Sequence, residues 1–226
     1  MNALVRLPLA RLGRTRRAWL PILGWIALGL ATAVVTRRTG FGTGADHTLR
    51  GTFAFVVLPL LSFTVVSAVL GGMGLRPSVR GLVALGAAPR RAVLAELAFA
   101  VVVAGGLAAI VGALVCMIAH GPADVPLARD LPATFLVSFA SGATYAAFFA
   151  AGSAIGRGAL RGFFLVADWL LGAPAGLLAV FVPRGHVMAL FGGGACYALS
   201  RTASSLLLVV LFVVYGALAL RLASRR

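Results

Sequence analysis

Six long stretches with almost no charge limit what this chain can fold into. They lie between Arg17 and Arg37, Arg50 and Arg76, Arg91 and His120, Asp130 and Arg157, Arg161 and Arg184, and Arg201 and Arg221, and contain 19, 25, 28, 26, 22 and 19 residues. About 20 helical residues cross a bilayer core, and lipid offers the backbone no hydrogen-bond partners. We therefore predict an all-α polytopic membrane protein with six transmembrane helices. Their expected positions are about 18–36, 53–73, 92–118, 131–155, 162–182 and 203–220.

The composition excludes a soluble protein. Hydrophobic residues make up 61% of the 226 residues and charged residues only 11%, against about a quarter in a globular domain. With so little charge the chain has no means of covering a water-facing surface. We expect residues 1–226 to form a single transmembrane domain.

The arginines give the predicted helices a direction. Fourteen of the 20 arginines fall on the side that holds both termini, and six fall on the other side. Positive residues are enriched in cytoplasmic loops, so both termini are expected to be cytoplasmic. The net charge of +15 would suit nucleic acid, but no stacking aromatic residues lie among the arginines. Membrane lipids with anionic headgroups are the expected partners, and nucleic acid is not.

The N-terminal region allows alternatives. Arg16 and Arg17 before an apolar run resemble an export signal, and Ala31-Thr32-Ala33 resembles a cleavage site. The run is long for a signal, and five more apolar stretches follow, so an uncleaved helix is favoured. Upstream, leucines alternate with arginines around Pro8, which predicts an amphipathic helix on the membrane surface or else a disordered basic tail.

Small residues recur every four positions in the fourth span. Ser138, Gly142, Ala146 and Ala150 form this ridge, and the fifth span repeats the spacing with Gly172 and Gly176. Such ridges let another helix approach closely. The last span is bulky throughout and is expected to face lipid. Pro59 and Pro174 lie inside spans, where they kink a helix unless neighbours satisfy the freed carbonyls.

One predicted cytoplasmic connection, residues 76–91, has a pattern of its own. Pro77 and Ser78 favour a helix start, and Gly86 with the following Pro89 favours an end. Within it, apolar or small residues share one side at helical spacing: Val79, Leu82, Val83 and Gly86. This is a short helix that either lies on the membrane surface or inserts into a cytoplasmic partner.

The run Leu85-Gly86-Ala87-Ala88-Pro89-Arg90-Arg91 after this helix, with the basic segment before the first span, resembles the permeases of ABC-2 type transporters. The resemblance implies that the connection is a coupling helix for an ATP-binding subunit. The residues that would make this contact are Ser78, Val79, Arg80, Leu82, Val83, Leu85 and Gly86. One departure from this family is the lack of acidic residues just before the helix. The same run also resembles FtsX-like permeases, but their large outer domain does not fit in the short outer loops of this chain.

The resemblance also implies partners and place. It implies a prokaryotic plasma (inner) membrane, a homodimer or a heterodimer with a second permease, and export. The apolar residues expected in the interior of the bundle suggest an amphipathic or lipid-like substrate. It further implies a short outer segment, for which residues 181–193 are suited because they are apolar but too few to cross. The chain has no Lys, so no phosphate-binding P-loop is possible in it. ATP and Mg²⁺ therefore belong to the partner ATPase, and no cofactor is expected in this chain.

Two acidic residues fall within predicted spans. Asp168 is either a functional intramembrane carboxylate or a structural partner of Arg161 or Arg157, and Glu96 is expected to form an ion pair at the inner interface. The three histidines have no metal-ligand spacing, so we expect solvated loop residues and no metal site. Cys116 and Cys196 are expected to be buried apolar residues, with a disulfide as the alternative.

Two other classes of function are weaker hypotheses. An intramembrane protease would need a Ser–His pair or two Asp residues at membrane depth, and only Asp168 lies there. We therefore do not expect an enzyme. A subunit for assembly or sensing is compatible with the composition, but no residue points to it.

Overall fold

The computed structural model describes residues 3–14, 16–40, 44–122, 124–156, 158–173 and 176–224, and these contain helices and no strand. The elements are α1 (Ala3–Arg14), α2 (Arg16–Thr39), α3 (Ala45–Thr48), the π-helix η1 (Leu49–Val57), α4 (Leu58–Val69), α5 (Leu75–Ala84), α6 (Pro89–Ala119), α7 (Leu127–Ile155), α8 (Ala159–Leu171), the 3₁₀ helix η2 (Leu177–Phe181), α9 (Pro183–Leu190), the 3₁₀ helix η3 (Cys196–Ala198) and α10 (Arg201–Ser224). This confirms the all-α fold class.

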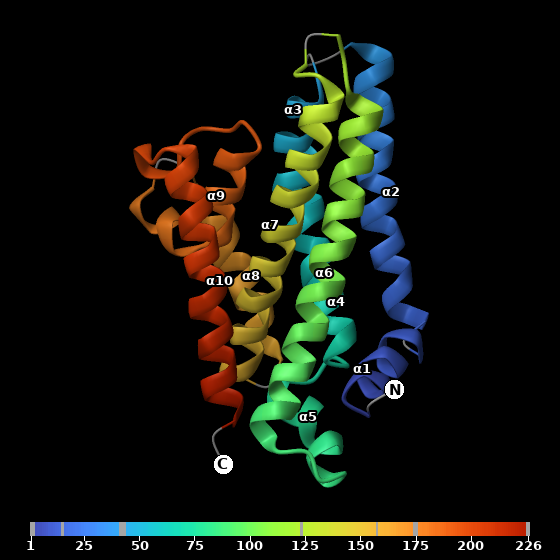
Figure 1. Cartoon of the computed structure of the whole chain (residues 1–226), viewed down its shortest axis with the longest axis vertical. Helices are drawn as coiled ribbons and strands as arrows, with labels where there is room; N and C mark the ends of the chain where they lie inside the picture. The colour runs from blue at the N-terminus through green and yellow to red at the C-terminus, as the bar shows by residue number, and fades with distance from the viewer. Residues whose placement is uncertain are drawn as a thin grey trace.

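Five helical stretches in the described part of the chain are long and apolar enough to cross a membrane. They are Ala18–Thr39 in α2, Ala45–Val69 through α3, η1 and α4, and the whole of α6, α7 and α10. They run side by side along the long axis of the molecule (Figure 1). Five of the six predicted spans are thus present as single helical stretches, and they indicate an integral membrane protein.

The prediction of one helix over 162–182 is wrong. Helix α8 has 13 residues, about 20 Å at 1.5 Å per residue, and ends at Leu171. Gly172 closes it, and the next described helix is η2, which starts at Leu177. In Figure 1 α8 starts near the lower end of the molecule, while α9 lies beside the upper half of α10. The fifth stretch is therefore discontinuous, and the small-residue ridge predicted at Gly172 and Gly176 falls in the break.

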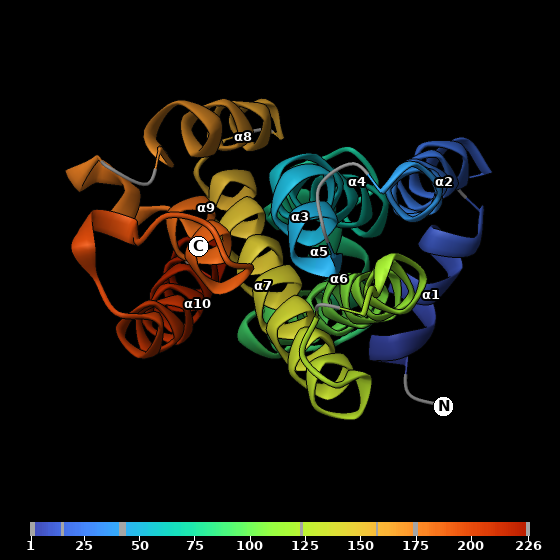
Figure 2. The same cartoon turned by 90° about the horizontal axis from the view of Figure 1, so that it is seen from above.

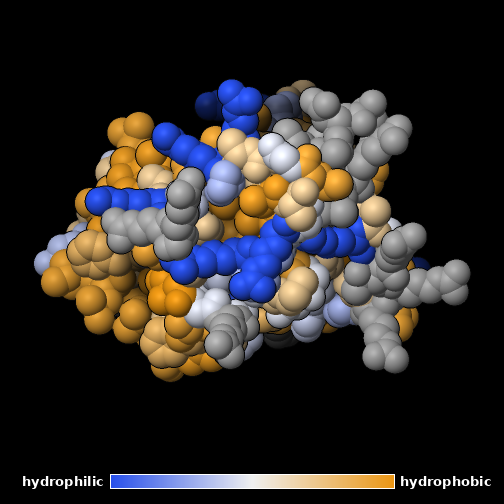
Figure 3. All heavy atoms as spheres, turned by 90° about the horizontal axis from the view of Figure 1, so that it is seen from below, coloured by the Kyte–Doolittle hydropathy of each residue, from blue (hydrophilic) through white to orange (hydrophobic). Residues whose placement is uncertain are grey.

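Both termini and α5 lie at one end of the molecule (Figure 1). We call this the basic end, because its exposed residues include Arg76, Arg80, Arg90, Arg91 and Arg221. Viewed from this side, hydrophilic residues lie across the middle and near the upper edge of the face, among apolar ones (Figure 3). Helix α1 lies here across the bundle axis. In Figure 2 α1 is viewed from the side, whereas α2 is viewed end on. The predicted N-terminal segment is therefore a helix at this end.

Helix α7 lies at the centre of the bundle, with α6 on one side and α10 on the other (Figure 2). The predicted ridge of Ser138, Gly142, Ala146 and Ala150 is fully buried. A Cβ on Gly142 would lie 2.7 Å from Ala108 Cβ and 2.8 Å from the Ala104 carbonyl oxygen. Only a residue without a side chain fits at this close approach of α6 and α7.

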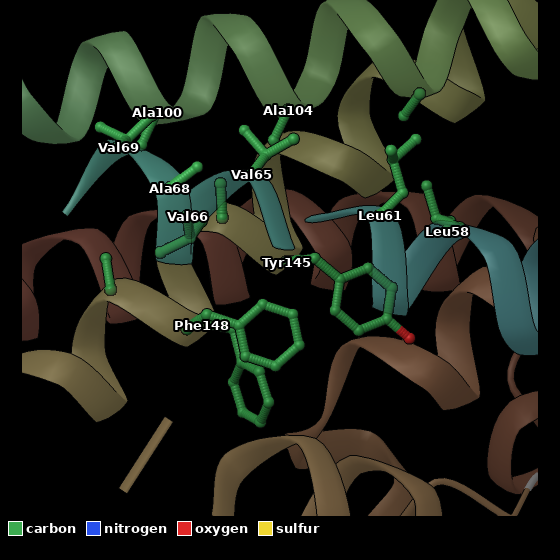
Figure 4. Close-up of a cluster of buried hydrophobic side chains, with 14 of the residues drawn as sticks. Leu58, Leu61, Val65, Val66, Ala68, Val69, Ala100, Ala104, Tyr145 and Phe148 are labelled. Carbon is green, nitrogen blue, oxygen red and sulfur yellow. The ribbon is translucent and has the colours of Figure 1, made fainter. Parts of the chain in front are cut away.

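Apolar side chains fill the space between these helices. Residues of α4 lie between Ala104 of α6 and the aromatic residues Tyr145 and Phe148 of α7 (Figure 4). Phe148 also packs edge to face against Tyr215 of α10, with ring centroids 4.9 Å apart. By contrast, Val209 and Val213 on the outer side of α10 are exposed, as predicted for a lipid-facing helix.

Candidate functional site

The first candidate site is the helix α5 at the basic end, which begins at Leu75, earlier than predicted, and stops as predicted. The Gly86 N–H donates to the Val83 carbonyl (2.9 Å), and the Ala87 N–H donates to the Leu82 carbonyl (3.0 Å). These two bonds form a Schellman cap, which needs a left-handed residue at Gly86, where φ is 87°. The cap fixes the angle between α5 and the following helix α6.

The residues predicted to contact a partner fall into two groups. Ser78, Val79 and Leu82 are buried against the bundle, whereas Arg80, Val83, Leu85 and Gly86 are exposed, Leu85 to 72%. Val83 and Gly86 therefore do not share the side of Val79 and Leu82, because the helix turns its most apolar line inward. The first group anchors α5, and only the second group is accessible to another protein.

Arg11 ties three elements together at this site. Its Nη1 lies 2.7 Å from Oε1 of Glu96 on α6, and its Nη2 donates to the Ser78 carbonyl of α5 at 2.5 Å. Glu96 is fully buried. The predicted ion pair of Glu96 is confirmed, but its partner comes from α1, 85 residues earlier in the chain. We call the contact of Arg11 with Glu96 and Ser78 the Arg11 clamp.

A cavity of about 440 Å³ opens beside α5. Its lining comprises Arg76, Pro77 and Arg80 of α5, residues 153–156 at the end of α7, and Leu222 of α10. Arg76 donates from Nε (2.9 Å) and Nη2 (2.6 Å) to the Leu222 carbonyl. The α5 helix is thus attached to the end of α10 as well as to α1 and α6.

Arg161 is buried near this end but does not pair with Asp168. Its Nε donates to Ser153 Oγ on α7 (2.7 Å), and its Nη2 donates to the Met73 carbonyl in the turn before α5 (2.9 Å). The predicted Arg161–Asp168 pair is therefore wrong. The other predicted partner, Arg157, lies outside the described residues.

Asp168 belongs to a second candidate site, inside the bundle. One carboxylate oxygen accepts from the Tyr145 hydroxyl of α7 (2.9 Å), and the other accepts from the backbone N–H of Arg184 (3.0 Å). Arg184 is the second residue of α9, so a carboxylate from α8 caps this helix start and complements its dipole. Asp168 thus joins α7, α8 and α9 where the fifth stretch is broken.

The Arg184 side chain was expected in an outer loop but is buried, with 4% of its surface exposed. Its guanidinium carbon lies 3.7 Å from the ring centroid of Phe55, and its Nη1 donates to the Phe55 carbonyl (3.3 Å). Phe55 lies in the π-helix η1, and Pro59 follows it with no N–H to donate to the preceding turn. Arg184 therefore bonds to a carbonyl in the turn before Pro59, and this proline inside an apolar run was the available sequence signal.

The remaining candidate residues are His186 and the two cysteines. His186 is buried rather than solvated, with Nε2 3.0 Å from the Val180 carbonyl. Cys116 and Cys196 are both buried and free. Across the described ranges, no three His, Cys, Asp or Glu side chains lie close enough to hold a metal ion.

Comparisons with protein families, with curated proteins and with solved structures show no match to this chain. Of the two candidate sites, the α5 site is the one accessible to another protein, because Arg80, Val83 and Leu85 are exposed there.

Proposed function

We propose that this chain is the membrane-spanning permease subunit of an ATP-driven ABC transporter, and that it exports an amphipathic or lipid-like substrate. A separate cytoplasmic subunit binds ATP and Mg²⁺ and docks on the basic end. Two permease chains, identical or different, form the path between them. The excess of arginine at the basic end favours a cytoplasmic location for this end.

The attachment of α5 to the bundle carries the proposal. Through the Arg11 clamp and the bonds of Arg76, this helix is connected to α1, α6 and the end of α10. A force on α5 therefore acts on three helices at once and is not absorbed by a loose loop. A coupling helix must have this property in order to change the packing of the spans.

The exposed side of α5 supplies a surface for the docking subunit. It combines the apolar residues Val83 and Leu85 with the cation Arg80. A partner with an apolar pocket and acidic residues at its edge would match this surface, because buried apolar contacts give affinity and opposite charges give orientation. The close contact of α6 and α7 at Gly142 supports a movement of the spans during transport. Helices in contact through small residues can shift between two packings.

Site-specific photocrosslinking tests the proposal. A photoreactive amino acid is placed at Leu85 or Val83, and in a matched control at the buried Leu82, in cells of the source organism. We expect the two exposed positions to crosslink to an ATP-binding subunit and position 82 to give no such product. The same subunit should co-purify with the permease and hydrolyse ATP.

The structure offers a second control outside α5. Met73 is an exposed apolar residue in the turn before α5, so Met73→Asp should leave the complex intact where Leu85→Asp disrupts it. Absence of any ATP-binding subunit from both the crosslinks and the purified complex would refute the proposal.

A further inference from the structure

A second cavity at the basic end lies between the start of α6 and the end of α10. Its volume is about 360 Å³, and its lining residues are Arg90, Ala217, Leu220, Arg221 and Ser224. This volume falls within the range of small-molecule sites. The cavity is separate from the one beside α5, with which it shares no lining residue.

The charge of this cavity is positive and uncompensated. Arg90 and Arg221 are both exposed, and neither guanidinium forms an ion pair or hydrogen bond within the described residues. The two nearest helix ends act in opposite senses on an anion. The first turn of α6 presents free N–H groups that favour it, whereas the last turn of α10 presents carbonyls that oppose it, of which the Leu222 carbonyl already accepts from Arg76.

The acidic residues of the chain are also engaged elsewhere. Glu96 is held by Arg11, and Asp168 is bonded to Tyr145 and to the Arg184 backbone. The other three acidic residues, Asp46, Asp124 and Asp130, belong to α3, to the loop between α6 and α7, and to the start of α7. No acidic side chain of this chain therefore pairs with the two arginines, and an anionic molecule can supply the counter-charge.

Beyond the two arginines the exposed surfaces of α6 and α10 are apolar. On α10, Val213, Ala217 and Arg221 are spaced by four and follow one line along the helix, and on α6 Leu94 lies four residues after Arg90. Leu94 is 45% exposed and Val213 is 58% exposed. The helices meet behind this line, since a Cβ on Gly216 would lie 3.9 Å from Leu97 Cδ2. The cavity and this apolar strip together form a groove, defined by Arg90, Leu94, Val213, Ala217, Arg221 and Ser224, with a cationic end and an apolar wall.

We propose that this groove binds one anionic phospholipid. Its phosphate lies between Arg90, Arg221 and Ser224, and an acyl chain runs along Leu94, Ala217 and Val213. Two unpaired cations select an anionic headgroup over a zwitterionic one, whose own amine offers a competing charge. The site depends only on membrane insertion of the bundle and is independent of the permease proposal.

Native mass spectrometry of the detergent-purified full chain tests the site, with phosphatidylglycerol as the anionic probe and phosphatidylcholine as the zwitterionic one. We expect one phosphatidylglycerol to be retained in preference to phosphatidylcholine. Each arginine near a membrane surface contributes about fivefold to binding of anionic lipid, so Arg90→Gln with Arg221→Gln should weaken it about thirtyfold.

The matched control is Arg80→Gln with Arg91→Gln, which removes the same charge from exposed arginines at the same end but outside the cavity. This pair should change binding less than threefold. Equal loss in both pairs would show a diffuse basic surface and overturn the site, as would equal retention of the two lipids. If the purified protein is a dimer and Arg90→Gln with Arg221→Gln dissociates it, a second copy of the chain occupies the groove. This result also overturns the proposal.

Discussion

Replacing Gly142 with valine should destabilise the protein far more than the same replacement at Gly106. Both residues lie in the interior of long helices, α7 and α6, so the change in helix propensity cancels between the two variants. Their surroundings differ. A Cβ on Gly142 meets the Ala104 carbonyl oxygen at 2.8 Å, whereas a Cβ on Gly106 meets nothing within 4 Å. The comparison therefore isolates the close approach of the two helices.

The expected cost follows from the atoms that must move. The Ala104 oxygen is backbone of a packed helix, so α6 and α7 must separate for the valine to fit. Overpacking of this kind lowers the free energy of unfolding by about 1–3 kcal/mol. Because valine adds three carbon atoms at a backbone contact, we expect Gly142→Val to cost about 3 kcal/mol. For a chain of this length about 2–4 °C is lost per kcal/mol, so the midpoint should fall about 6–12 °C below that of Gly106→Val.

Thermal unfolding in detergent, followed by loss of the monodisperse peak in size-exclusion chromatography, measures this difference. Gly105→Val should lie between the two variants, because its Cβ would approach the Phe139 ring and carbonyl oxygen at 3.1 Å. If Gly142→Val unfolded within about 1 °C of Gly106→Val, α6 and α7 would not be in contact at Gly142 and the packing argument would fail.

Three further predictions concern polar residues. Arg11→Ala leaves the Glu96 carboxylate buried without its partner, so it should cost about 3 kcal/mol, and adding Glu96→Gln should restore most of the loss in the same thermal assay. Asp168→Asn keeps one acceptor oxygen for two donors and should cost about 1–2 kcal/mol, so an unchanged unfolding midpoint would refute its role in joining three helices. Cys116 and Cys196 are free and buried, so mild oxidation should leave mobility on a non-reducing gel unchanged, and a faster band would contradict this.

The spans that are continuous apolar helices could be predicted from the sequence, because length and hydropathy alone determine whether a helix can cross lipid. The break after Leu171 could not. The interval between Arg161 and Arg184 has the right length and composition, and only Gly172 and its neighbours signal that the helix stops. Counting apolar residues does not show whether they form one helix or two shorter ones.

The partners of the buried charged residues were also beyond sequence reasoning. Nearby arginines were the natural candidates for Glu96 and Asp168, because they lie in the same stretch of chain, and Arg161, seven residues before Asp168, shares its helix face. The actual partner of Glu96 is Arg11, and Asp168 bonds to Tyr145 and a backbone N–H. These contacts depend on how α1 and α9 pack, which no local pattern encodes. The α5 cap, by contrast, was predicted well, since a Schellman motif is a local structure signalled by Gly86.

The Arg11 clamp also sets an order of events during synthesis. Arg11 leaves the ribosome 85 residues before Glu96, and at about 5–20 residues per second this separation lasts about 4 to 17 s. During this interval α1 has no protein partner in α5 or α6, and the anionic headgroups of the membrane surface are the available counter-charge for its arginines. We therefore expect nascent Arg11 to contact lipid headgroups first and to pair with Glu96 only once α6 has been synthesised.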